Sequence, residues 1–191
     1  LRRENYNADD SVIRYADTRL RARAEWKMNE AWTLSNEAYY LESKRRWLNI
    51  ENYKLNLAAN RVDRSDYLEI QHDLEQTGNR LEASLKQGGH RAVFGWETAR
   101  VNFRHTNNAP YGGSSSVAIH NPAHGQWFSP DPTLPKFETA STLNAFYAED
   151  AWQLGERWLL LAGFRHDRAA INRDELVSGS EAARRGESGQ G

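Results

Sequence analysis

The strict alternation of apolar and polar residues in residues 145–167 constrains this chain more than any other feature of its sequence. Counting by twos places four apolar residues on one side: Trp158, Leu160, Ala162 and Phe164. The other side combines charged residues with a glycine and two leucines: Leu159, Leu161, Gly163, Arg165 and Asp167. A period of two is typical of a β-strand, because a helix would mix the two sets around its circumference.

Residues 17–28 show the same pattern even more clearly. Apolar residues occupy the even positions from Leu20 to Met28, and charged residues occupy the odd positions from Arg19 to Lys27. The sequence therefore predicts an all-β chain of about six strands, at residues 17–28, 32–47, 67–86 and 91–106 and in the two halves of 145–167. In the third of these strands the apolar positions change phase, which predicts a β-bulge near Gly78.

The connections between these strands alternate between short and long. Two long connections are predicted, at residues 49–65 and 107–137. The second contains all five prolines, which would remove hydrogen bonds from a strand, and its segment 112–116 reads as a flexible Gly/Ser loop. Residues 1–15 are expected to be loop-like, and residues 176–191 to be disordered or a truncated loop.

Tryptophans mark both ends of two of the short turns. The segments WKMNEAW and WQLGERW place Trp26, Trp32, Trp152 and Trp158 on the apolar sides of their strands. Outer-membrane β-barrels have short turns on one side, long loops on the other, and aromatic girdles where the lipid-facing surface meets water. We therefore expect these four tryptophans to form such a girdle and the charged sides to line the lumen.

A soluble antiparallel sandwich or barrel is the main alternative, because it too has one dry and one wet face. The alternating loop lengths and the repeated Trp motif favour the membrane barrel over it. Six strands are fewer than the minimum of about eight for a closed membrane barrel. We therefore expect residues 1–191 to be one part of a larger barrel.

Composition excludes several other classes of protein. The chain has 191 residues, no cysteine and a net charge of −1, which argues against disulfide frameworks, thiolate metal sites and nucleic-acid binding. It has no apolar run long enough for a transmembrane helix and no secretory signal peptide at its start. The sequence contains no nucleophile elbow, no phosphate loop and no zinc-binding His-Glu helix, so we do not expect an enzyme.

Residues 146–168, FYAEDAWQLGERWLLLAGFRHDR, resemble the strand–turn–strand of TonB-dependent outer-membrane receptors, in particular the siderophore receptors. Such barrels commonly carry (F/Y)-A-(E/Q)-D-x-W-x-L, a turn, and a run ending G-x-R-x-D. The matching residues are Tyr147, Ala148, Glu149, Asp150, Trp152, Leu154, Gly163, Arg165 and Asp167. Residues 63–85, with HTNNAPYGGSS and SPDPTLP between 105 and 135, also resemble siderophore-receptor barrels.

This resemblance implies a barrel of about 22 strands in the bacterial outer membrane that imports a ferric siderophore with energy relayed by TonB. The expected partners are outer-membrane lipid, the siderophore, and TonB acting through a plug domain or TonB box; no cofactor is expected, since the iron chelate is cargo. The chain contains no plug domain, no TonB box and no aromatic-ending last strand, so we expect it to come from the middle of the barrel. A passive porin-type barrel is the alternative.

The resemblance also implies that aromatic and basic side chains of the long loop bind the ligand. The candidates are Tyr111, His120, His124, Trp127 and Phe128, because a flat ring can stack on a chelate and a basic group can offset its charge. The alternative for Trp127 and Phe128 is that they only pack the loop against its neighbours.

Two further patterns favour structural roles. His120 and His124 are four residues apart, but Pro122 lies between them and no carboxylate is near, so we expect exposed histidines and no metal site. The row Arg19, Arg21, Arg23 is expected to pair with carboxylates on the next strand. Arg165 and Asp167 are expected to serve the barrel wall.

Overall fold

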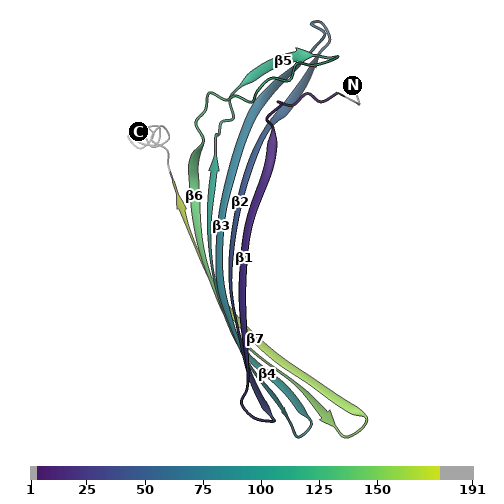
Figure 1. Cartoon of the computed structure of the whole chain (residues 1–191), viewed down its shortest axis with the longest axis vertical. Coiled ribbons are helices and arrows are strands. Elements are labelled where there is room, and N and C mark those ends of the chain that lie inside the picture. The colour runs from purple at the N-terminus through teal and green to yellow at the C-terminus, as the bar shows by residue number, and fades with distance from the viewer. Residues whose placement is uncertain (1–3, 177–191) are drawn as a thin grey trace, which may run out of the picture.

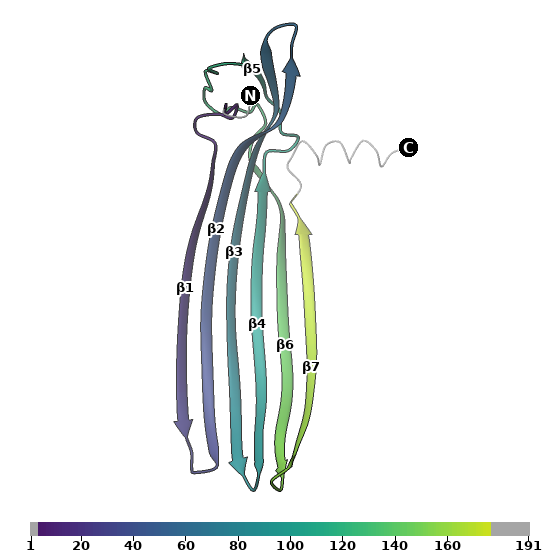
Figure 2. The same ribbon diagram turned by 90° about the vertical axis from the view of Figure 1, so that its right-hand side faces the viewer.

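The computed structural model describes residues 4–176, whose regular structure is entirely β-strand. The strands are β1 (Val12–Lys27), β2 (Trp32–Asn56), β3 (Arg61–Gln87), β4 (His90–Asn107), β5 (Ser114–Ala118), β6 (Leu134–Leu154) and β7 (Trp158–Glu175). They form one antiparallel sheet in the order β1–β2–β3–β4–β6–β7, and the short β5 pairs with β3. Figures 1 and 2 show the long strands side by side in a tall, curved sheet. The predicted all-β, up-and-down arrangement is confirmed.

The short turns lie together at one end of the sheet, which we call the turn end (Figure 2). Between β1 and β2, Asn29 Oδ1 accepts hydrogen bonds from the backbone N–H groups of Ala31 and Trp32, both at 2.9 Å. Between β3 and β4, Gly88 and Gly89 have φ angles of 59° and 84°. Two-residue hairpin turns need this left-handed backbone, which glycine adopts without steric cost.

The opposite end, which we call the loop end, differs from the prediction for residues 49–65. The structure shows no long connection there: β2 and β3 stay paired up to Asn56 and Arg61, around a turn at residues 57–60. Residues 51–57 are mostly exposed on both sides of this hairpin. The β2 half of the hairpin therefore has no dry face and shows no apolar alternation. On the β3 half alternate positions are buried, but they carry Val62 and Arg64, so the sequence shows no apolar alternation there either.

The predicted bulge near Gly78 is wrong. The β2–β3 register runs without a shift from Trp32 opposite Leu85 to Ile50 opposite Tyr67. Gly78 instead lies beneath the Tyr39 ring, at a position where an added Cβ would overlap that ring. The register shift of the long strands lies between His105 and Thr106, where β4 pairs with β6.

The long connection between β4 and β6 contains structure of its own. Ser114–Ser116, expected in a flexible loop, belong to β5, and residues 134–137 are already part of β6. Pro135 is accommodated next to the register shift, where the missing N–H costs least. Of residues 176–191, all but Leu176 lie outside the described part of the chain.

Buried apolar side chains gather at the loop end in two small clusters. One contains Ala8, Ile50 and Tyr67 with Trp127 packed against it, and the other contains Val62, Val117 and Ile119 with Tyr6. Residues 4–11 and the β4–β6 connection therefore cover the upper strands. Toward the turn end, by contrast, large apolar side chains are exposed, such as Trp158 at 74%. Within the described residues, no helix has the length and apolar character needed to span a membrane.

Candidate functional site

The unbroken register assigns every long-strand residue to one of two faces, because directly paired residues share a face. Face 1 carries the four turn-flanking tryptophans. One of its rows, near the turn end, is Trp26, Leu34, Ala83, Phe94, Ala148 and Phe164. Face 2 carries the odd-numbered arginines: Arg19, Arg21, Arg23 and Arg165.

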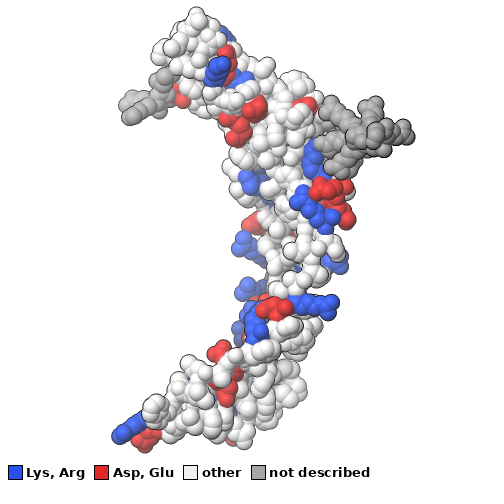
Figure 3. Space-filling view, turned by 180° about the vertical axis from the view of Figure 1, so that it is seen from behind, with Lys and Arg blue, Asp and Glu red and all other residues white. Residues whose placement is uncertain are grey.

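The polarity of both faces reverses about halfway along the strands. Toward the loop end, face 1 carries a charged row: Lys44, Asp73, Arg104, Glu138 and Asp174. Face 2 changes in the opposite sense, from ion pairs near the turn end to apolar side chains such as Leu41, Val101 and Ile171. In Figure 3 a broad uncharged area lies toward the turn end, and charged side chains gather along the middle of the sheet. The apolar phase change that predicted a bulge is therefore this exchange of faces.

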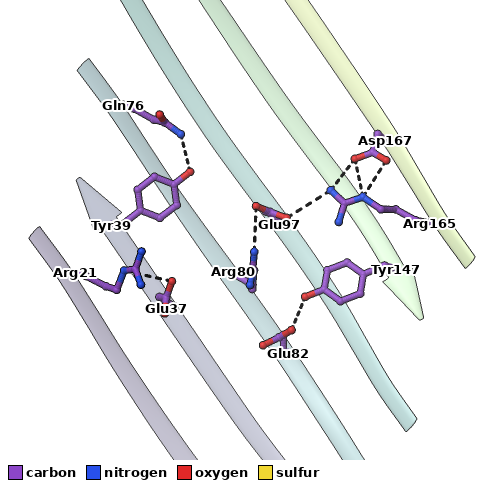
Figure 4. Close-up of polar contacts among 10 residues, drawn as sticks. All are labelled: Arg21, Glu37, Tyr39, Gln76, Arg80, Glu82, Glu97, Tyr147, Arg165 and Asp167. Atoms are coloured by element: carbon purple, nitrogen blue, oxygen red, sulfur yellow. Dashed lines mark hydrogen bonds and ion pairs between the residues drawn. The ribbon is translucent and has the colours of Figure 1, made fainter. Parts of the chain in front are cut away.

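Near the turn end, face 2 is held together by polar contacts between strands (Figure 4). Glu97 on β4 lies between two guanidinium groups, at 3.6 Å from Arg80 and 3.5 Å from Arg165, and Arg165 also contacts Asp167 at 2.8 Å. Tyr147 Oη donates to Glu82 Oε1 at 2.6 Å. The barrel-wall role expected of Arg165 and Asp167 agrees with these contacts.

The arginine row on β1 pairs only partly as expected. Arg21 contacts Glu37 on the next strand at 3.6 Å. Arg19 and Arg23 instead contact carboxylates two residues away on their own strand, at 3.0 and 3.6 Å.

The four tryptophans proposed as a girdle all lie near the turn end of face 1. Trp158 and Trp26 are largely exposed, at 74% and 62%. Trp152 stacks on His90 with centroids 4.8 Å apart, and Trp32 stacks on Phe94 at 6.3 Å. Their positions fit a band of aromatic rings at one end of an apolar surface. Their contact with lipid stays a prediction.

On the loop-end half of face 2, one row of directly paired residues crosses the sheet and consists of aromatic and cationic side chains. We call it the transverse row: Tyr15, Arg45, His72, His105 and Phe137, from β1, β2, β3, β4 and β6. His105 stacks on Phe137 at 5.0 Å, and the two histidine rings are 5.0 Å apart. The three rings from β3, β4 and β6 thus form a continuous series of contacts.

Two guanidinium groups lie against rings of this region, one from Arg45 within the row and one from Arg173 on β7. Arg45 lies against the rings of Tyr15 and Trp47, at 5.6 and 5.2 Å from their centroids. Arg45 Nε is buried without a hydrogen-bond partner, and Arg45 makes no ion pair within residues 4–176. Arg173 lies 3.7 Å from the Phe137 centroid. Aromatic faces interleaved with cations suit a flat or negatively charged ligand.

The two histidines at the centre of the row are joined by a hydrogen bond of 2.9 Å between His72 Nε2 and His105 Nδ1. Burial, the neighbouring His105 and Arg45 lower the pKa of His72. Burial, Arg173 and Lys136 lower the pKa of His105. Both rings are therefore neutral at pH 7.

The structure separates the five loop candidates into two groups. Trp127 and His124 hold the loop in place: Trp127 Nε1 donates to the Asn49 carbonyl at 3.2 Å, and His124 Nδ1 lies 3.1 Å from Asp9 Oδ1. Phe128 is 70% exposed, His120 is exposed, and Tyr111 is half-buried with a φ of 69°. Ligand contact by any of the five stays a prediction. Within residues 4–176 no group of three or more His, Asp or Glu side chains is arranged to hold a metal.

The base of the loop is fixed by polar residues that sequence reasoning did not single out. Asn108, which is fully buried, donates to the Tyr67 carbonyl and Ser129 Oγ and accepts from the Glu69 backbone N–H. Burial alone would raise the pKa of Glu69, but hydrogen bonds from Thr133, Gln71 and Arg46 outweigh it and lower the pKa.

The transverse row was also missed, and only part of it could have been found. Its members lie far apart in the sequence, and their alignment depends on the register of four strand pairs. The available signal was that the odd positions Tyr15, Arg45 and Trp47 are aromatic or basic.

Comparison with known proteins places this geometry in context. The family model described as TonB dependent receptor-like, beta-barrel, matches residues 1–190. A search of curated proteins finds no match.

Among solved structures, the siderophore receptor PiuA from Acinetobacter baumannii matches with a TM-score of 0.70 and 18% identity, over 92% of this chain and 28% of that one. BauA, the ferric preacinetobactin receptor of the same organism, matches with a TM-score of 0.69 and 11% identity, over 86% and 26%. The ferric citrate transporter FecA, in unliganded form, matches with a TM-score of 0.56 and 10% identity, over 85% and 22%. At these identities the likeness establishes the fold, and the chain spans about a quarter of each structure's length.

Proposed function

This chain belongs to the TonB-dependent receptor β-barrel family, and we propose that it forms part of an outer-membrane receptor that imports a ferric siderophore with energy relayed by TonB. The family consists of receptors and transporters rather than enzymes, and its members are outer-membrane barrels. The similar solved structures, a siderophore receptor, a ferric preacinetobactin receptor and a ferric citrate transporter, support an iron chelate as cargo.

The reversal of polarity supports an orientation in the membrane. The apolar band of face 1 near the turn end would face lipid, with its tryptophans at the inner interface. Beyond the reversal, the charged half of face 1 would stand in water on the extracellular side. Face 2 would then line the lumen, and the turn end would be periplasmic.

The transverse row is the observation that carries the ligand proposal. In this orientation it lies on the lumenal face, between the ion-paired wall and the β4–β6 loop, where an incoming ligand must pass. Arg45 supplies a positive charge without a carboxylate partner within residues 4–176. The exposed Phe128 and His120 on the loop would complete the contact from above.

Uptake of radiolabelled ferric siderophores by cells that carry the full-length receptor tests this proposal. We expect uptake to require TonB, which excludes passive diffusion through a porin-type barrel. Arg45→Gln should weaken uptake about tenfold, as expected for removal of an interaction of ~1.4 kcal/mol. Arg19→Gln is the matched control, because this exposed arginine on the same face pairs with Asp17. TonB-independent uptake, or no uptake of any ferric siderophore by the wild type, would refute the receptor function.

A further inference from the structure

We propose that His72, His105 and Asn107 form an acid-sensitive latch that holds the base of the β4–β6 loop to the end of β4 and to the neighbouring strand β3. The latch consists of three consecutive hydrogen bonds that leave no free site for an additional proton. Protonation therefore has to break one of them and loosen the loop. This device would act on the loop itself, whichever ligand the receptor carries.

The backbone fixes the direction of every hydrogen bond in the latch. The Ala109 backbone N–H can only donate, and it lies 3.0 Å from Asn107 Oδ1. Asn107 Nδ2 therefore points at His105 Nε2, at 2.9 Å, and donates to it. A neutral imidazole that accepts at Nε2 carries its proton on Nδ1, so His105 donates to His72 Nε2 at 2.9 Å.

Each possible protonation site is thus already occupied by a donor. A proton added to His105 Nε2 would face the Asn107 amide N–H, so the Asn107 side chain would have to turn away and release Ala109. A proton added to His72 Nε2 would face His105 Nδ1–H, which would separate the two rings. Either event breaks a hydrogen bond at the end of β4.

The charged groups around the pair oppose protonation. Arg45 on β2, Lys136 on β6 and Arg173 on β7 all disfavour a positive charge on the histidines, whereas Asp73 on β3 favours it at His72. Glu175 on β7 is engaged with Arg173 at 2.7 Å. Because the latched state resists the proton more than the open state does, its stability is full above a pH of about 6.5 and is lost as the pH falls below it.

The same contacts argue against a metal site at this pair. His105 Nδ1 carries the proton that a metal would have to displace, and moving that proton to Nε2 would create a clash with Asn107. The loop base, in contrast, depends directly on the latch, because the residue after Asn107 is the fully buried Asn108.

Amide hydrogen exchange of the full-length receptor in lipid vesicles tests the latch. We expect exchange at Ala109 and its neighbours, corrected for the intrinsic pH dependence, to rise about tenfold between about pH 7.5 and about pH 5.5, since each proton taken up contributes at most tenfold per pH unit. The variant H72Q/H105Q should remove most of this rise. His120→Gln, an exposed histidine in the same loop, should keep it.

A second variant, Asn107→Asp, should reverse the effect of acid on amide exchange at the loop base. A carboxylate of the same shape still accepts from Ala109 and now also accepts from a protonated His105, so acid should tighten the loop base. His124, the second histidine of this loop, contacts Asp9 and no member of the latch. A wild-type loop whose exchange is independent of pH above about 5, or an unchanged response in either variant, would overturn the latch. These outcomes do not depend on siderophore uptake.

Discussion

Replacing Gly95 by alanine should destabilise the barrel wall more than any other single methyl group added to this sheet. Gly95 on β4 lies directly opposite Tyr147 on β6, and the Tyr147 ring covers it. A Cβ at this position would lie closer than 3.0 Å to three ring atoms, a separation that real Cβ atoms essentially never show. The ring would have to move, because the strand backbone is fixed by pairing on both sides.

The loss of stability on Gly95→Ala can be estimated from the hydrogen bond that the Tyr147 ring makes. Tyr147 Oη donates to Glu82 Oε1 on β3 at 2.6 Å, so the ring bridges β4 and ties β6 to β3. Loss of a hydrogen bond to a charged acceptor costs about 1.5–3 kcal/mol, and an off-rotamer ring costs about 0.5–1.5 kcal/mol. Against this, alanine stabilises a strand by about 0.5–1 kcal/mol relative to glycine, because glycine loses more conformational entropy on folding. We expect a net loss of about 2–3 kcal/mol in the free energy of unfolding.

Urea unfolding of the full-length protein in lipid vesicles measures this loss. Gly163→Ala is the matched control, because its added Cβ meets nothing closer than 3.6 Å, and its free energy of unfolding should stay unchanged or rise slightly. In a Tyr147→Ala background, Gly95→Ala should cost less than about 0.5 kcal/mol, since the clash is gone. Equal losses in both backgrounds would refute the argument from ring overlap.

Three further predictions concern the loop and the second ring–glycine pair. Asn108→Ala should release the loop base and make it accessible to proteases. The buried Glu69 N–H and Tyr67 carbonyl would lose their hydrogen-bond partners, at a cost of about 1–3 kcal/mol each. A loop that resists cleavage would contradict this. Phe128→Ala should weaken siderophore binding, measured by calorimetry, without loss of stability. Trp127→Ala should instead loosen the loop, measured by hydrogen exchange. Similar effects of the two substitutions would refute the assignment of Trp127 as an anchor and Phe128 as a ligand contact. Gly78→Ala should cost about 1–2 kcal/mol in urea unfolding, less than at Gly95, because Tyr39 holds only a neutral hydrogen bond.

The sequence predicts the strands of the turn-end half well because one dry face imposes a strict period of two there. The even-numbered residues from Leu20 to Trp26 and from Trp158 to Phe164 lie on face 1 as predicted, and the turns beside them are set by Asn29 and by glycines. The prediction fails where both sides of a strand are wet, as in residues 51–57. Strand pairing there continues the backbone hydrogen bonds of the preceding residues, and no pattern of apolar side chains indicates it.

The candidate site could be predicted only in its loop. Aromatic and basic residues between 107 and 137 were visible, and the structure divides them into anchors such as Trp127 and exposed groups such as Phe128. The transverse row needs the register of β1 to β6, which no local pattern supplies. Asn108 was equally hidden, because its role depends on Tyr67 and Glu69, about forty residues earlier in the chain.

The change of apolar phase occurs in all six long strands, and its position argues for a boundary between two solvents rather than for local irregularities. In β2 it falls between Tyr40 and Leu41, in β4 after Trp96, and in β7 after Phe164. A bulge would shift the register of every later pair, whereas the β2–β3 pairing continues unchanged across the phase change. The row that joins Trp26 to Phe164 lies next to the turn in β1 but six residues inside β7, so the strands are staggered. From β1 to β7 the phase change also shifts toward the turn end, relative to this row. The apolar band therefore keeps a nearly constant height although the strands are tilted. A lipid layer of fixed thickness imposes this geometry on a barrel wall.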